Sequence, residues 1–222
     1  MLNLFFPKVC EACHGVLKDN EILICTKCRH QLPLTNYHYD NPEAVKKVLF
    51  GRVQLMNATS LLHFSKKGIV QQLVHNLKYR GHEAIGHFFG EWLGTELSEI
   101  DTYKAVDVVI PVPLHPSKLR KRGFNQVTKF GKAIAEALGA QFTEHILIKT
   151  KNTRTQVFKE RLRRWSDQGA QFQITDGQSL TGKHILLVDD IITTGSTIES
   201  CAEVLYAIDD IQLSIATIAI AD

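Results

Sequence analysis

The sequence predicts an α/β protein, in which helices flank a parallel sheet and a small metal-binding segment precedes it. Strand-like apolar segments alternate with helical segments along most of the chain, which is typical of a parallel sheet covered on both faces. Four of the five cysteines fall within the first 28 residues. The 222 residues are 44% apolar and 22% charged, the composition of an ordinary globular protein.

The apolar pattern and the N-terminal residues argue against a membrane-embedded or an exported protein. No apolar run approaches the ~18 residues that a membrane-spanning helix needs. The first ten residues, MLNLFFPKVC, lack the basic start of a secretory signal. We therefore expect a cytoplasmic protein without a membrane span.

The four early cysteines form two C-x2-C pairs, Cys10 with Cys13 and Cys25 with Cys28. Two-residue spacing lets both thiolates of a pair reach one ion, and two such pairs make a closed tetrahedral site. We predict a structural Zn²⁺, with an iron–sulfur cluster or a redox dithiol as the lesser alternatives. The predicted domains are a zinc ribbon over residues 1–35 and an α/β domain over residues 36–222. We expect the α/β domain to keep its fold without the metal, because its core would be separate.

The remaining elements follow from hydrophobic periodicity and from glycine and proline positions. We predict helices within residues 41–50, 66–80, 83–97, 124–139, 157–165 and 195–208. We predict strands within residues 58–64, 105–113, 145–150, 183–190 and 211–221.

The most specific segment, ILLVDDIITTGST, covers residues 185–197. It reads as a buried strand that ends at Asp189 and Asp190, followed by a turn that opens a helix. Ligands of open α/β sheets bind at this edge, and a helix N-terminus binds phosphate. Two adjacent acids suit ribose hydroxyls or hydrated Mg²⁺. The alternatives are a merely capped helix, or a receiver domain, whose acidic pair would follow the first strand rather than a late one.

This segment resembles the signature of the phosphoribosyltransferases, which grip 5-phosphoribosyl-1-pyrophosphate (PRPP) together with Mg²⁺. The resemblance implies that Asp189 and Asp190 contact the ribose hydroxyls as catalytic residues. It also implies that the turn holds the 5′-phosphate. The turn residues are Thr193, Thr194, Gly195, Ser196 and Thr197.

Further segments resemble the ComF family, the competence-protein-F-like proteins. They are LKYRG (residues 77–81), DVVIPVPLH (107–115), RGFNQ (122–126), and Thr155 and Gln156 with Arg164 and Trp165. The resemblance covers nearly the whole chain and includes the four-cysteine ribbon. It implies a type I phosphoribosyltransferase-like sheet behind a zinc ribbon.

A basic stretch over residues 115–165 holds thirteen Lys/Arg and three Asp/Glu, a local balance of +10. Such a concentration indicates a polyanionic ligand, and a solvated surface is the plainer alternative. By resemblance, the loop after the 105–113 strand holds the pyrophosphate, and a mobile loop that starts near residue 149 closes over the site. The candidate contacts are Arg122, Asn125, Gln126, Lys151, Arg154, Gln156 and Arg164.

The resemblance implies a protein that binds PRPP or another ribose phosphate and handles single-stranded DNA during natural transformation. A helicase-like competence protein is the implied partner. The alternatives are an active phosphoribosyltransferase of nucleotide metabolism and a regulator that senses PRPP without turnover. The residues themselves leave turnover and the acceptor open.

Overall fold

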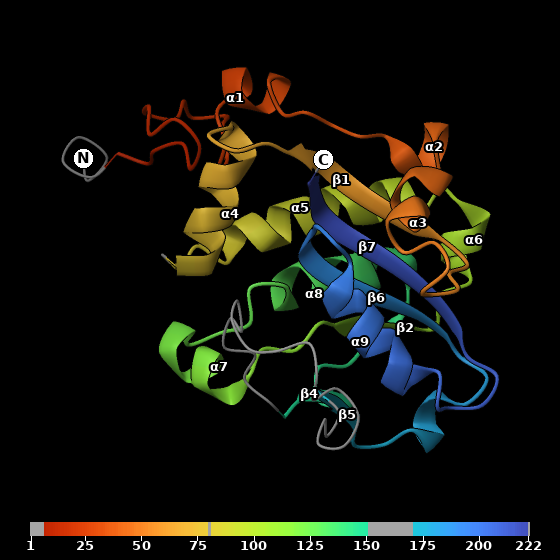
Figure 1. The fold of residues 1–222 in the computed structure, drawn as a ribbon. Coiled ribbons are helices and arrows are strands. Elements are labelled where there is room, and N and C mark those ends of the chain that lie inside the picture. The colour runs from red at the N-terminus through yellow and green to blue at the C-terminus, as the bar shows by residue number, and fades with distance from the viewer. Residues whose placement is uncertain (1–6, 80, 151–170, 222) are drawn as a thin grey trace, which may run out of the picture.

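A five-stranded sheet forms the centre of the computed structural model, which describes residues 7–79, 81–150 and 171–221 (Figure 1). Its strand order is β1-β7-β6-β2-β3, and every neighbouring pair is parallel. The strands are β1 Ala58–Phe64, β7 Gln212–Ala221, β6 His184–Ile192, β2 Val108–Pro111 and β3 Gln141–Phe142. The predicted parallel α/β architecture is therefore confirmed.

Helices connect these strands, and a second, two-stranded sheet lies beside them. The helices are α1 Thr26–His30, α2 Tyr37–Asp40, α3 Glu43–Val48, α4 Ile69–Tyr79, α5 Ala84–Leu97, α6 Asp101–Lys104, α7 Pro116–Arg122, α8 Thr128–Leu138 and α9 Ser196–Leu205. The small sheet pairs β4 Leu147–Lys149 with β5 Phe172–Ile174 in antiparallel fashion. Among the described residues, none of the helices has the length and apolarity needed to cross a membrane.

Successive side chains of the central strands enter two different hydrophobic clusters, as the alternation along a strand requires. In β6, Leu186 and Val188 face the cluster built with α4, α5 and α8. Ile185 and Leu187 face the cluster built with α3, α9 and the β4–β5 sheet. Both faces of the sheet are therefore buried, which explains the continuous apolar run before the two acids.

Helices α5 and α8 pack unusually closely, because α5 presents glycines to α8. A Cβ atom on Gly90 would lie 2.5 Å from the carbonyl oxygen of Phe130, and one on Gly94 would lie 2.9 Å from the Cβ of Ala137. The absence of side chains at these positions fixes the distance between the helices. It also fixes where the chain enters α8, directly after Gln126.

Two predicted elements differ from the structure. The basic segment after β2, expected as a loop, forms the helix α7, with His115 as the N-cap, Pro116 at its first position and Gly123 in the left-handed conformation after its end. Strand β6 continues two residues past Asp190, because Ile191 and Ile192 still pair with β7. The predicted helix within residues 157–165 lies outside the described residues.

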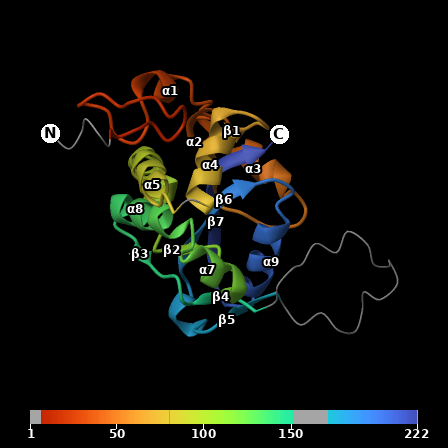
Figure 2. The ribbon, with the colours of Figure 1, turned by 90° about the vertical axis from the view of Figure 1, so that its left-hand side faces the viewer.

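The N-terminal segment shares a hydrophobic cluster with the sheet domain, contrary to the expected separate core. Cys10, Ile24 and Cys28 belong to the same buried cluster as Leu73 and Val74 of α4. A segment this short buries too little apolar surface by itself, so it uses α4 and α5 as its second layer. Figure 2 shows α1 and the neighbouring N-terminal residues against these helices, on the opposite side of the molecule from β4 and β5.

Candidate functional site

The carboxyl end of β6 and the turn that follows it make the most elaborate polar site of the described chain. Four buried apolar residues lead to Asp189 and Asp190, β6 continues to Ile192, and the chain then turns into α9. Gly195 has a φ of +76°, a left-handed conformation that costs glycine little. The turn at Gly195 leads directly into the N-terminus of α9.

Asp190 is only 5% exposed, and two side chains pair with its carboxylate. The Nε2 of Gln126 donates a hydrogen bond to Oδ2 at 2.6 Å. The Nζ of Lys78, in the last turn of α4, lies 2.8 Å from Oδ1. A buried carboxylate needs such partners to stay ionised, so α4 and the segment before α8 both support this acid.

Asp189 has different surroundings, although it is the adjacent residue. Burial raises the pKa of Asp189 to about 8, and the nearby Asp190 charge acts in the same direction. The backbone N–H of Asp190, which donates to Asp189 Oδ1 at 2.8 Å, and the charges of Lys78 and Lys149 offset part of this increase. The pair thus combines one acid that contacts two partner side chains with one acid whose raised pKa favours the protonated form near neutral pH.

The turn between β6 and α9 is held from outside by the segment after α3. Arg52 donates through Nη2 to the Thr194 carbonyl at 2.7 Å and through Nη1 to Glu199 Oε2 at 2.6 Å. Leu49 packs against Gly195 so closely that a Cβ there would lie 2.5 Å from Leu49 Cδ2. The turn is therefore braced before any ligand arrives, while Thr193, Thr194 and Ser196 remain exposed.

The predicted basic residues reach the site only in part. Arg122 donates a hydrogen bond to Gln126 Oε1, and Gln126 in turn donates to Asp190. The guanidinium of Arg122 also lies 5.4 Å from the ring centre of Tyr79. Asn125 instead donates to the Val112 carbonyl at 3.0 Å and shapes the loop after β2. The other predicted contacts, Lys151, Arg154, Gln156 and Arg164, lie outside the described residues.

Two residues of the site were missed in the sequence, Lys78 and Arg52. Lys78 lies within the LKYRG segment, so the signal for it was present, although nothing in the sequence shows which acid it would meet. Arg52 lies in a segment without periodicity or a motif. Its contact with Thr194 depends entirely on the tertiary fold.

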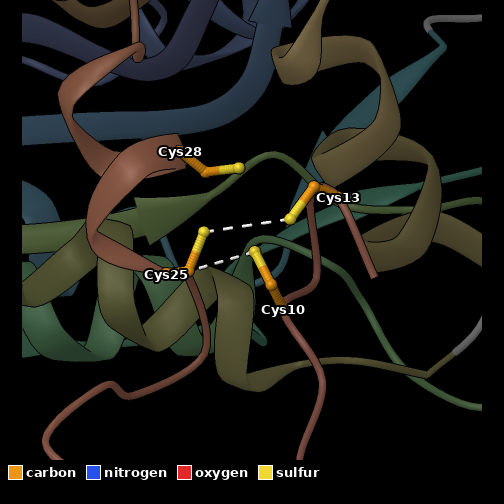
Figure 3. A group of neighbouring side chains, drawn as sticks. All are labelled: Cys10, Cys13, Cys25 and Cys28. Carbon is orange, nitrogen blue, oxygen red and sulfur yellow. Dashed lines mark hydrogen bonds between the residues drawn. The ribbon is translucent and has the colours of Figure 1, made fainter. Parts of the chain in front are cut away.

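The four cysteines form a second candidate site, in which the thiol groups point toward one another (Figure 3). All four Sγ atoms lie within 4.8 Å of one another, and Cys13 Sγ is 3.8 Å from Cys25 Sγ. Tetrahedral Zn–S bonds of about 2.3 Å place sulfur atoms about 3.8 Å apart, so the donor set fits zinc.

Backbone donors favour the thiolate form of Cys10, which is the form that binds metal. Burial acts to raise the pKa of Cys10, but backbone N–H groups of Cys25, Cys13 and Ala12 outweigh it and lower the pKa to about 7. The N–H of Cys25 lies 3.3 Å from Cys10 Sγ. Cys10 is thus prepared for a cation before the cation binds.

The parallel sheet with a phosphate-type turn at its carboxyl edge agrees with the family comparison. Residues 129–221, from α8 to β7, match the family described as "Phosphoribosyl transferase domain". The matched part of the chain includes the β6–α9 turn, and the four-cysteine cluster lies N-terminal to it.

The chain is also a homologue of proteins named for DNA use and competence. It is 26% identical to "DNA utilization protein YhgH" of Escherichia coli O157:H7 over 201 residues, 89% of this chain and 83% of the relative. It is 26% identical to "Competence protein ComFC" of Bacillus subtilis over 206 residues, 89% and 78% of the two chains. It is 30% identical to "Competence protein ComFC" of Streptococcus pneumoniae over 142 residues, which are 64% of this chain and 59% of the relative. The predicted resemblance to the ComF proteins is therefore confirmed.

The first prediction concerns the metal. Cys25→Ser should remove about one equivalent of zinc per chain and lower the melting temperature of the whole protein, because the cluster shares its core with α4. Metal analysis and calorimetry measure both. Cys201→Ala, at a buried cysteine in α9, is the matched control and should keep the zinc. Full zinc content in Cys25→Ser would contradict the four-cysteine site.

The second prediction concerns pH. The folded state holds the Asp189 proton up to about pH 8, whereas an unfolded aspartate releases it near pH 4. The free energy of unfolding should therefore fall as the pH rises between these values, by up to about 1.4 kcal/mol per unit. Asp189→Asn lacks this term, so its stability relative to the wild type should increase from pH 5 to pH 8. Urea unfolding at both pH values measures this difference, and identical pH profiles would rule out the raised pKa.

Proposed function

We propose that the protein binds PRPP with Mg²⁺ at the β6–α9 turn and acts in the handling of single-stranded DNA during competence. The observation that carries the proposal is the turn itself. Two carboxylates and an exposed hydroxyl-rich turn meet at the carboxyl edge of a parallel sheet, inside a phosphoribosyltransferase domain.

Each part of PRPP has a complementary group at this site. The α9 N-terminus and the hydroxyls of Thr193 and Ser196 suit the 5′-phosphate. The carboxylates of Asp189 and Asp190 suit the ribose hydroxyls. Arg122, at the end of α7 and linked through Gln126 to Asp190, suits the pyrophosphate.

Magnesium would supply charge neutralisation of the pyrophosphate, and the chain has the donor chemistry for it. Mg²⁺ prefers carboxylate oxygens and keeps several waters, which suits the partly buried Asp189. Ionisation of Asp189 would be favoured by a cation beside it, because opposite charges lower the pKa of an acid. Binding of the Mg²⁺ complex should therefore tighten as the pH rises.

An active transferase is the second candidate, and the same two acids favour it. Transfer of the ribosyl group builds positive charge on the ribose, which nearby carboxylates stabilise. Release of pyrophosphate with an amine or base acceptor would establish this activity. Binding without release would leave the protein as a ligand-dependent module.

The DNA part of the proposal rests on the names of the homologues and on α7. The relatives are named for DNA utilization and competence. Helix α7 carries Lys118, Arg120 and Lys121 on its exposed surface and buries none of its residues. An exposed cationic helix whose last residue, Arg122, is linked through Gln126 to Asp190 suits the backbone of a single strand. A helicase-like competence protein remains the proposed partner on that strand.

The third prediction tests the ligand. Calorimetry with PRPP and Mg²⁺ should show binding to the wild type and none to the double variant Asp189→Asn, Asp190→Asn, because the ribose and the cation lose their acceptors. Circular dichroism checks that the variant keeps its fold. Equal affinities for the two proteins would reject this site.

The fourth prediction tests the strand. Fluorescence anisotropy at low salt should show sequence-independent binding of labelled single strands. A plot of log affinity against log salt concentration should fall with a slope of roughly 0.7 for each phosphate that the protein neutralises. The double variant Arg120→Gln, Lys121→Gln should lower both the affinity and the slope. The charge-matched control Lys104→Gln, Lys183→Gln should change neither. No binding by the wild type would remove direct DNA handling from the proposal.

A further inference from the structure

The first cysteine pair and the ribose-phosphate site are connected through the end of α4. Glu11 lies between Cys10 and Cys13, within the first C-x2-C pair. Lys78 lies near the end of α4 and pairs with Asp190 at 2.8 Å. Polar contacts join Glu11 to residues on either side of Lys78, and the backbone of the α4 end links those residues to Lys78.

Asn76 makes the first of these contacts. It lies two residues before Lys78 and is fully buried, with 0% exposure, although its side chain is polar. Its Nδ2 donates to the carbonyl oxygen of Glu11 at 2.9 Å and lies 3.3 Å from Glu11 Oε2. Gln72 donates to Asn76 Oδ1 at 3.0 Å, so the amide group has partners at both ends.

His82 makes the second contact, on the other side of Lys78. Its Nδ1 lies 2.5 Å from Glu11 Oε1. The two oxygens of one carboxylate thus reach residues before and after Lys78. The last turn of a helix ordinarily frays, because its carbonyl groups lack partners within the helix. Here Glu11 holds that turn from both sides.

We propose that Glu11 is a positioning residue, which holds the end of α4 so that Lys78 stays on Asp190 and keeps the ribose-phosphate site assembled. The effect of Glu11 on the ligand passes through Lys78 and involves no contact with the ligand itself. This inference rests on the proposed function of the site as a PRPP-binding site.

The physical reason is the burial of Asp190. A lysine side chain is long and flexible, and ordering it costs entropy that a fixed helix end reduces. A buried carboxylate that loses its cation is strongly disfavoured, and the site would rearrange or take up a proton. A ligand that needs this carboxylate as an acceptor would then bind less tightly, because the site is no longer organised in advance.

The alternative is that Lys78 blocks ligand binding, because its ammonium group occupies the place that the ligand would take on Asp190. The two roles predict opposite changes. A positioning lysine makes Lys78→Met bind PRPP more weakly, whereas a blocking lysine makes it bind more tightly.

Calorimetry with PRPP and Mg²⁺ compares the full-length variants. Glu11→Ala and Lys78→Met should each weaken binding by about tenfold, the effect of losing one charge-assisted hydrogen bond. Asp19→Ala removes an exposed acid from the same N-terminal segment and should leave the affinity unchanged. The double variant Glu11→Ala, Lys78→Met should be no weaker than Lys78→Met alone, because Glu11 acts through Lys78.

A second measurement needs no ligand. Acetylation of lysines by an N-hydroxysuccinimide ester, followed by mass spectrometry, reports how accessible each amine is. Lys78 should react several-fold faster in Glu11→Ala than in the wild type, and Lys104 is the internal reference. Metal analysis of Glu11→Ala should still give the wild-type zinc content, which separates positioning from loss of the metal.

The outcomes separate the inference from the proposed function. No PRPP binding by the wild type rejects the proposed function, and the acetylation rates then decide the inference alone. Unchanged Lys78 reactivity in Glu11→Ala overturns the inference. Fully additive losses in the double variant, or tighter binding by Lys78→Met, overturn it as well.

Discussion

The carboxylate of Asp190 is the constraint on which the arrangement of the site depends. A charge with this little exposure must have partners, and each partner comes from a different element. Lys78 arrives on α4, and Gln126 arrives just before α8. Gln126 in turn orients Arg122 at the end of α7. One buried charge thereby sets where two helices and a basic segment lie relative to the sheet, and the glycines of α5 allow α8 to approach closely enough.

Local patterns predicted the elements with strong periodicity, and long-range contacts account for what was missed. The 58–64 strand was predicted with the bounds of β1. Strand β6 was found from the continuous apolar run of residues 185–188, which is a local signal. Helix α7 was missed despite its His-Pro start and Arg-Gly end, because seven residues without an apolar face give no periodicity. Asp189 and Asp190 could be found from their motif. Their unequal environments could not, because these depend on Lys78 and Gln126, which lie far away in the sequence.

The N-terminal segment illustrates a limit of domain prediction from spacing alone. The C-x2-C pairs correctly place the four thiols together, since this geometry is local. Whether such a ribbon is independent depends on what covers its other side. Here Arg29 lies 5.0 Å from the ring centre of Trp92 on α5, and Cys28 joins the cluster of α4 and α5. The ribbon and the sheet domain consequently stabilise each other, although they are distinct in sequence.

The order of the strands bears on how the chain folds during synthesis. Strand β7, Gln212–Ala221, lies between β1 and β6, so these two strands do not pair with each other and are joined only through β7. On the ribosome, β1 and β6 would each expose an unpaired edge to other nascent chains. The antiparallel bridge between Leu34 and Leu62 covers one side of β1 and leaves the other side open for β7. Completion of the sheet thus waits for β7, and nascent chains that pause before residue 212 keep one open edge on β1 and one on β6.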